Sequence, residues 1–311
     1  MNKIQNLLYL CITLFTIAIV SIIFYARKPR TAEVAVPEPP SLSDIPFGSD
    51  VFLPDTLTLA GEAVPLHRPD VREALEKELI VNTYLHSHTI QLLQGSPRVF
   101  AILEPLLEAN GIPDDFKYLA VIESRLNPLA VSPAGAVGMW QIMKNTAREL
   151  GLEVNNEVDE RYHVEKSTLA AAKYLKKAYD KFGSWTLAAA SYNAGFNMIS
   201  RQMNIQQEQD YYNLLLGDET ERYVFRILAL KQIMNHPEKY HFKVENVYPA
   251  EPTHQVEVKG NVRSWADFAK EQGITYKTLK RFNPWLRKSD LKNYRRKTYQ
   301  ISIPEDTQLY Q

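Results

Sequence analysis

The sequence predicts a mainly α-helical protein that ends in a small module of mixed secondary structure. Apolar residues recur at helical spacing through most of residues 70–235, which is typical of packed amphipathic helices. After residue 249, two alternating segments flank two short helical ones, in the order strand, helix, helix, strand. A length of 311 residues is also that of about two domains.

An apolar segment precedes both parts. The nineteen residues from Leu7 to Tyr25 carry no charge and would span about 28 Å as a helix, just enough for a bilayer core. Basic residues follow at once and no convincing A-x-A cleavage site is present, so residues 1–28 are predicted to be an uncleaved transmembrane anchor. A cleaved signal segment is the alternative. Residues 29–56 contain six prolines and are predicted to form an extended linker.

The charge and cysteine content exclude several kinds of protein. Thirty-six basic and thirty-six acidic residues give a net charge of zero, so no nucleic-acid partner is predicted. Cys11 is the only cysteine, which excludes an intramolecular disulfide and a cysteine metal cluster. His86 and His88 lie two apart on a predicted helix and point in different directions, so no metal site is predicted there. We also expect no cofactor.

Several segments are predicted to be scaffold helices. Their ranges are 70–93, 97–110, 145–150, 165–182 and 218–235. Gly95 and Gly111 are interpreted as the stops of the first two. Asp114 or Asp115 is expected to cap the short helix that follows Pro113. Ser184 is expected to cap a helix that ends at Gly195, and the alanines of residues 165–182 indicate close helix packing.

Glu123 continues the apolar stripe of that short helix. Phe116, Leu119 and Ala120 precede it at helical spacing. Burial among apolar neighbours and a place near the negative end of the helix dipole both disfavour the carboxylate anion. We therefore expect a raised pKa, as a general acid working near neutral pH requires. The alternative is a helix-end glutamate that pairs with Arg125 or with solvent.

A loop rich in proline and glycine follows the helix. Pro128 prevents the helix from continuing, and Gly135 and Gly138 allow the backbone to approach a ligand closely. Trp140 and Gln141 then offer a stacking face and an amide, groups suited to holding sugar rings. The helix and the loop together are predicted to form the functional centre.

Four motifs, in a fixed order, resemble those of a known family. They are Glu123-Ser124, Ser132 to Met143 (SPAGAVGMWQIM), Ala190 to Gly195 (ASYNAG) and Glu219 to Val224 (ETERYV). The sequence resembles the soluble-lytic-transglycosylase family, relatives of goose-type lysozyme that cleave peptidoglycan, and in particular its membrane-bound members from about residue 65 to 243. The resemblance implies a lysozyme-like helical catalytic domain, predicted as residues 57–248.

The resemblance also implies roles for the matched residues. Glu123 would be the general acid and then the base of a lytic transglycosylase, which cleaves the β-1,4 bond between N-acetylmuramic acid and N-acetylglucosamine and forms 1,6-anhydromuramic acid. The side chains implied in substrate binding are Ser132, Gln141, Met143, Tyr192, Asn193 and Tyr223. Asp159 and Arg161 are interpreted as a salt bridge in a loop, and Glu219 and Glu221 as charges in the first turn of a helix, so none of the three carboxylates is predicted to be a second catalytic group.

Two other functions stay open. One is a lysozyme-like hydrolase of the same fold, and the other is a non-catalytic peptidoglycan-binding protein. The resemblance implies peptidoglycan glycan strands as the partner, the membrane as a second partner through the N-terminal segment, and a place in the bacterial cell envelope outside the cytoplasm. Charge counting mildly favours the opposite orientation, because three basic residues follow the apolar run and only Lys3 and the amino terminus precede it.

The C-terminal module is predicted as residues 249–311. Its expected strands are residues 254–259 and 297–303, and its expected helices are residues 264–272 and 276–282. It resembles LysM, the peptidoglycan-binding unit, in the segments Ile274-Thr275-Tyr276 and Phe282-Asn283-Pro284. The usual Gly-Asp-Thr-Leu opening of that unit is replaced by Gly260-Asn261-Val262-Arg263, which leaves sugar binding by the module open.

Overall fold

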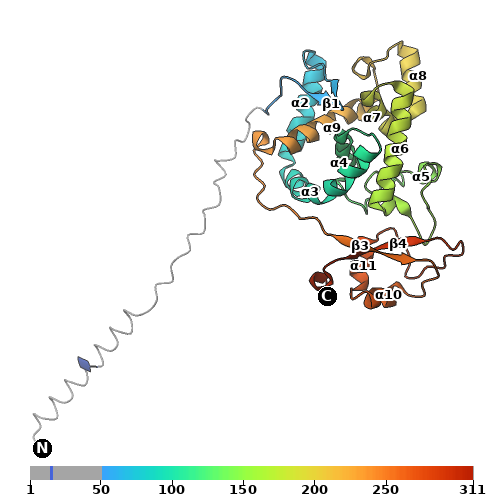
Figure 1. Ribbon diagram of the computed structural model, residues 1–311. Coiled ribbons are helices and arrows are strands. Elements are labelled where there is room, and N and C mark those ends of the chain that lie inside the picture. The colour runs from blue at the N-terminus through green and yellow to red at the C-terminus, as the bar shows by residue number, and fades with distance from the viewer. Residues whose placement is uncertain (1–14, 17–50, 311) are drawn as a thin grey trace, which may run out of the picture. The chain divides into compact units, whose positions relative to one another are not determined.

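The computed structural model describes residues 15–16 and 51–310 of the chain (Figure 1). By its internal contacts the chain divides into a unit of Met1–Ser49 and a unit of Asp50–Gln311. The predicted transmembrane anchor and most of the predicted linker lie outside the described residues. Among residues 15–16 and 51–310, none of the helices combines the length and the hydropathy that a membrane-spanning segment requires.

The second unit begins with a short antiparallel hairpin of β1 (Thr58–Leu59) and β2 (Glu62–Ala63), followed by helices. The helices that precede the C-terminal module are α2 (Pro69–Tyr84), α3 (His86–Ala109), α4 (Lys117–Ser124), α5 (Lys144–Glu149), α6 (Val164–Phe182), α7 (Trp185–Ala194), α8 (Phe196–Gln206) and α9 (Asp218–Asn235). The mainly helical architecture predicted from the sequence is therefore confirmed for this part of the chain.

Helix α4 lies in the interior of the helical part, between α3 and α9 (Figure 1). Leu119 and Ala120 of α4 are fully buried, as are Leu228 and Ala229 of α9. Helix α9 also packs against α2 and α7. Burial of this many apolar side chains is the main favourable term in folding, and it fixes α4 and α9 relative to each other.

Small residues mark the packing of α6 against α7. Ala171 of α6 and Ala188, Ala189 and Ala190 of α7 are completely excluded from solvent. Ser184 caps α7, because its Oγ accepts a hydrogen bond from the backbone N–H of Leu187 at 3.3 Å. The close packing, the cap and the helix of residues 218–235 agree with the sequence predictions.

Two local predictions were wrong. Gly95 does not stop a helix, because α3 runs through it, and the break falls instead at Leu85. A Cβ at Gly95 would lie 3.8 Å from the ring of Tyr248, an ordinary van der Waals contact, so the helix continues through this position without a clash. Neither Asp114 nor Asp115 caps a helix. Asp115 instead accepts hydrogen bonds from the backbone N–H of Ala60 at 2.6 Å and from the ammonium group of Lys231 at 2.7 Å.

The C-terminal module has the predicted order of strand, helix, helix and strand. Its elements are β3 (Thr253–Val258), α10 (Trp265–Glu271), α11 (Tyr276–Phe282) and β4 (Tyr299–Pro304), with β3 and β4 antiparallel. The buried amide of Asn283 joins α11 to β4, donating to the carbonyl of Ser302 at 2.8 Å and accepting from its N–H at 2.9 Å. Ile301 and Ile303 of β4 fill the core of the module.

The core of this module extends into the helical part. Val137, Val158 and Tyr162 belong to the same buried cluster as Trp265 and Trp285. Val158 also forms an antiparallel bridge with Leu286. The backbone N–H of Asp159 donates to the carbonyl of Trp285 at 3.0 Å. The N–H of Arg287 donates to the carbonyl of Glu157 at 2.8 Å. The module is therefore packed against the loops at residues 137 and 157–162.

Candidate active site

The acid at the centre of the site is Glu123, on the last turn of α4. Arg125 and Leu126 adopt positive φ angles of 57° and 61°, and this left-handed backbone ends the helix. The Oε1 atom of Glu123 accepts a hydrogen bond from the hydroxyl of Tyr223, which comes from α9. Arg125 contacts His88 instead, with 2.7 Å between Nη2 and Nδ1. The pairing of Glu123 with Arg125 that the sequence left open is therefore wrong.

Burial raises the pKa of Glu123 to about 7. The hydrogen bond from Tyr223 and the positive charge of Arg226 lower this pKa, and the negative charge of Glu219 raises it. Desolvation of the anion is the largest of these effects, and it is the physical cause expected from the apolar stripe of α4. The carboxyl group is thus held protonated to near neutral pH, as a proton donor to a leaving group must be.

Two tyrosines flank this acid, the buried Tyr223 and the partly buried Tyr192. Burial keeps the pKa values of both Tyr192 and Tyr223 well above the usual value, and the negative charge of Glu123 raises both further. The hydroxyl of Tyr192 donates to the carbonyl of Trp140 at 2.8 Å, and its ring packs edge-on against Tyr174 at 5.1 Å. Tyr192 therefore links α7 to the loop after α4, while Tyr223 is the tyrosine bonded to the acid.

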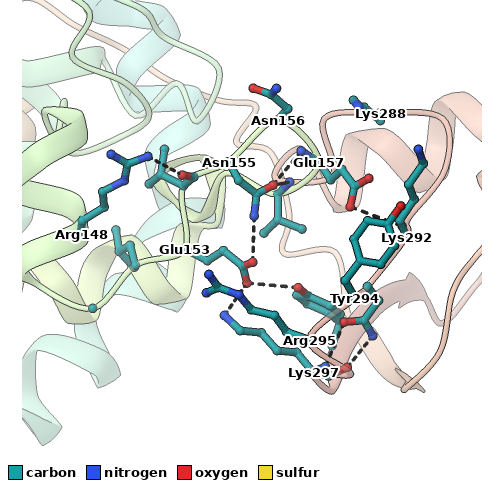
Figure 2. Close-up of a pocket in the computed structure, with 16 residues that line it drawn as sticks. Arg148, Glu153, Asn155, Asn156, Glu157, Lys288, Lys292, Tyr294, Arg295 and Lys297 are labelled. Carbon is teal, nitrogen blue, oxygen red and sulfur yellow. Dashed lines mark hydrogen bonds and ion pairs between the residues drawn. The ribbon is translucent and has the colours of Figure 1, made fainter.

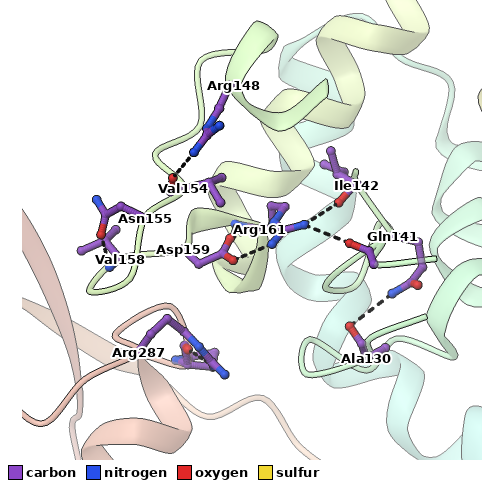
Figure 3. Close-up of polar contacts among 12 residues, drawn as sticks. Ala130, Gln141, Ile142, Arg148, Val154, Asn155, Val158, Asp159, Arg161 and Arg287 are labelled. Atoms are coloured by element: carbon purple, nitrogen blue, oxygen red, sulfur yellow. Dashed lines mark hydrogen bonds and ion pairs between the residues drawn. The ribbon is translucent and has the colours of Figure 1, made fainter. Parts of the chain in front are cut away.

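The predicted substrate-binding loop is folded on itself. The Oγ of Ser132 accepts from the N–H of Ala136 at 3.0 Å. The Nε2 of Gln141 donates to the carbonyl of Gly138 at 2.7 Å. It also donates to the carbonyl of Ala130 at 3.3 Å, the bond drawn in Figure 3. Both side chains therefore stabilise the loop, and each keeps polar capacity beyond these bonds, because the Ser132 hydroxyl proton and the Gln141 carbonyl oxygen are not used in them.

Arg161 holds this loop from one side, as Figure 3 shows. Its Nη1 donates to the carbonyls of Gly135 at 3.2 Å and Ile142 at 3.3 Å. Its Nε and Nη2 donate to the two carboxylate oxygens of Asp159 at 3.0 and 2.7 Å. The interpretation of Asp159 as a salt-bridge residue rather than a second catalytic carboxylate agrees with this arrangement. The pair joins the loop to the segment that contacts the C-terminal module.

The remaining predicted residues lie in two places. The amide of Asn193 donates to Glu219 at 3.1 Å and accepts from the hydroxyl of Thr220 at 2.8 Å, so it connects the end of α7 to the start of α9. Met143 precedes α5 and has a relative exposure of 45%. Among the predicted site residues, Glu123 and Tyr223 are therefore hydrogen-bonded to each other directly. Asn193 is bonded to Glu219, whose negative charge raises the pKa of Glu123.

Two expectations about the loop were wrong. Trp140 is fully buried, and its Nε1 donates to the hydroxyl of Thr168 at 2.9 Å, so it is a core residue and offers no stacking face to a sugar. Gly138 does make a close approach, but to protein: a Cβ there would lie 2.0 Å from the carbonyl oxygen of Arg161. Sequence spacing does not tell which side of a loop a ring faces.

The sequence analysis assigned no role to two residues that contribute to the site. Arg226 lies one turn after Tyr223 on α9, a spacing that puts the two on one helix face, and its charge acts on Glu123. The Oγ of Ser124 donates to the carbonyl of Met139 at 2.7 Å, which joins the end of α4 to the loop. The described residues contain no group of three or more His, Cys, Asp or Glu side chains that could hold a metal ion.

The comparison with known families agrees with this architecture. Residues 102–215 match the model of the transglycosylase SLT domain, and residues 254–307 match the model of the soluble lytic transglycosylase C-terminal LysM-like domain. The chain therefore contains a transglycosylase SLT domain followed by a LysM-like domain of the kind found at the C-terminus of soluble lytic transglycosylases.

Relatives with curated descriptions are similar over different shares of the chain. The chain is 29% identical to membrane-bound lytic murein transglycosylase D of Escherichia coli K12 over 245 residues, which are 76% of this chain and 53% of that protein. It is 34% identical to membrane-bound lytic murein transglycosylase F of Salmonella typhi over 119 residues, which are 35% of this chain and 24% of that protein. The chain thus spans about half the length of the first relative.

A more distant similarity exists to a solved structure, the 70 kDa soluble lytic transglycosylase of Escherichia coli. The sequence identity is 22% with a TM-score of 0.40, over 48% of this chain and 26% of that one.

Proposed function

We propose that this chain is a peptidoglycan lytic transglycosylase that cleaves the β-1,4 bond between N-acetylmuramic acid and N-acetylglucosamine and leaves a 1,6-anhydromuramic acid end. The observation that carries the proposal is the half-buried Glu123, with a pKa of about 7 and a hydrogen bond from Tyr223. The four motifs and the matched SLT domain support peptidoglycan as the substrate class.

The chemistry uses one acid twice. Protonated Glu123 gives its proton to the glycosidic oxygen, the bond from that oxygen to C1 breaks, and the N-acetylglucosamine leaves with a free 4-hydroxyl. The acetamido oxygen of the muramic acid supports the positive charge at C1. The Glu123 carboxylate then takes the proton of the C6 hydroxyl, whose oxygen bonds to C1. No water is consumed, and Glu123 returns to its protonated form.

The flanking residues support this cycle in different ways. The hydroxyl of Tyr223 donates to Glu123 and stabilises the anion that exists between the two proton transfers. Ser132, Gln141 and Asn193 are proposed to orient the acetamido and hydroxyl groups of the substrate. Tyr192 and Met143 are proposed to line the sugar-binding cleft. These roles follow the family motifs.

The proposed setting of the enzyme is the cell envelope. Two similar proteins are named as membrane-bound. We infer an anchor in residues 1–28, a linker in 29–56, a catalytic domain in 57–248 and a LysM-like domain in 249–311, with the catalytic domain outside the cytoplasm. Cell fractionation combined with protease protection in intact spheroplasts tests this, since a cytoplasmic body would be protected from protease.

The deciding experiment is mass spectrometry of the muropeptides that the purified chain releases from peptidoglycan. Products lighter by one water than the corresponding hydrolytic products are expected. Glu123→Gln should lower their release by about a hundredfold or more. Glu221→Gln is the matched control, because it removes an exposed carboxylate from the first turn of α9 and leaves the proposed acid in place. Reducing-end products would identify a hydrolase instead, and binding without products would identify a peptidoglycan-binding protein.

A further inference from the structure

A groove lies where the segment after α5 faces the loop before β4 (Figure 2). Its volume is about 860 Å³. Residues 148–158 of the helical part form one wall, and residues 288–299 of the C-terminal module form the other. Two parts of the chain far apart in sequence therefore build one concave surface, and none of the residues proposed for the glycan-cleaving site lines it.

Cationic side chains predominate in this groove. Five of them line it, namely Arg148, Lys288, Lys292, Arg295 and Lys297, against the two carboxylates of Glu153 and Glu157. The whole chain has a net charge of zero, so the local excess is a property of this surface and not of the composition. Like charges gathered in one hollow repel each other and attract an anion.

Both carboxylates already have partners. Glu153 accepts from the ammonium group of Lys297 at 2.8 Å and from the hydroxyl of Tyr299 at 3.1 Å. Glu157 accepts from the backbone N–H of Lys292 at 3.3 Å. These bonds are drawn in Figure 2. The acidic residues thus serve to hold the two walls together and leave most of the positive charge in the groove uncompensated.

Three cations are free to meet a ligand. Within the described part of the chain, the side chains of Lys288, Lys292 and Arg295 have no carboxylate within 4.0 Å and make no hydrogen bond. All three are exposed. Tyr294, between them, has a relative exposure of 84%, and Asn156 on the opposite wall is exposed as well. The groove therefore offers several ammonium or guanidinium donors, an aromatic face and an amide.

We propose that this groove binds the carboxylate-bearing peptides attached to peptidoglycan glycan strands. The inference rests on the proposed function for its choice of polymer. Ammonium and guanidinium groups recognise carboxylates, and an exposed tyrosine with an amide suits a peptide backbone or a sugar ring. Tyr294 is the one large exposed apolar side chain among the residues that line the groove, whereas an anionic membrane surface binds best to basic faces that insert several apolar side chains.

The site would add a second hold on the substrate, beside the sugar-binding cleft. Linking two binding sites on one chain raises the overall affinity for a polymer that can occupy both. The consequence is a preference for glycan that still carries its peptides over glycan from which they have been removed.

The test is binding to glycan strands that are immobilised on a solid support, before and after an amidase removes the peptides. The full chain carries Glu123→Gln throughout, so that the polymer stays intact. Lys288→Gln/Lys292→Gln is compared with Lys270→Gln/Lys277→Gln, which removes two exposed charges from α10 and α11 outside the groove. The groove variant should bind intact peptidoglycan about fivefold or more weakly, and the control variant should bind as the parent does. Lys288→Arg/Lys292→Arg should retain binding.

Several results would overturn the proposal. These are equal binding of intact polymer by the groove variant and its parent, equal binding of intact and peptide-free polymer by the parent, or a loss confined to phosphatidylglycerol vesicles. The anhydro-muropeptide assay on the same substitutions with Glu123 present separates the two proposals. If the groove variant forms anhydro products and binds the polymer as its parent does, the groove does not bind the peptides. The proposed lytic transglycosylase function would still hold.

Discussion

Asp159 and Arg161 form an ion pair with 2.7 Å between Oδ2 and Nη2, and both side chains are almost excluded from solvent. The guanidinium of Arg161 also donates hydrogen bonds to the carbonyls of Gly135 and Ile142. These two residues belong to the loop that carries the predicted substrate contacts. The backbone of Asp159 is bonded to Trp285 of the C-terminal module. The pair therefore connects that module to the loop beside the proposed acid.

Replacement of Arg161 tests whether this connection positions the loop. Arg161→Met leaves the carboxylate of Asp159 buried without its partner, so the free energy of unfolding should fall by about 3–5 kcal/mol. Arg161→Met/Asp159→Asn removes the charge as well and should recover part of the stability in urea denaturation. Release of muropeptides should stay low in the double variant, because the loop carbonyls have lost their donor. Wild-type activity in the double variant would show that Arg161 has only a structural role.

Gly138 and Gly135 give a matched pair of substitutions in the same loop. Both have positive φ angles, 83° and 85°, but a Cβ at Gly138 would lie 2.0 Å from the carbonyl of Arg161, whereas a Cβ at Gly135 meets nothing within 4 Å. Gly135→Ala should cost about 1 kcal/mol from backbone strain alone. Gly138→Ala must displace the backbone and should cost several times more, with loss of activity. Thermal unfolding measures both, and equal costs would contradict the close approach of Gly138 to Arg161.

The sequence predicted most of the helices because their signals are local. Helix α9 has a continuous apolar stripe and acidic residues in its first turn, and Ser184 marks the start of α7. Gly95 misled because a glycine inside a helix costs only about 1 kcal/mol, and burial of neighbours such as Leu92 and Leu93 outweighs that cost.

The site was predictable only in part. Glu123 stood out because a carboxyl group continued an apolar stripe, and the same burial raises its pKa in the structure. The bonds from Trp140 to Thr168 and from Arg161 to the carbonyl of Gly135, by contrast, join segments about twenty to thirty residues apart, which no local pattern encodes. The basic groove likewise requires contact between residues 148–158 and 288–299, which are far apart in the sequence. The net charge of the whole chain is zero and gives no indication of it.

The pKa of Glu123 predicts the pH dependence of cleavage. The acid must be protonated, so kcat/KM should be level below pH 7 and fall about tenfold per pH unit above it. Tyr223→Phe removes a hydrogen bond that lowers this pKa, so the falling limb should move to higher pH. Glu219→Gln removes a negative charge that raises the pKa, so the limb should move to lower pH. Shifts in the same direction, or none, in the pH–rate profiles of the two variants would contradict this assignment.

The same pKa makes Glu123 a source of pH-dependent instability. Its pKa is raised to about 7 in the folded chain from 4.5, so the folded state binds more protons between these values. The free energy of unfolding should therefore fall as the pH rises from 4.5 to 7, by about 2–3 kcal/mol at most from this group. Glu123→Gln removes the buried charge, so it should be more stable than the wild type at pH 8 and equally stable at pH 4. Urea denaturation at both values measures the difference. A difference that is the same at pH 4 and pH 8 would mean that burial does not oppose ionisation of Glu123, and the acid of the proposed mechanism would then have to be another carboxyl group.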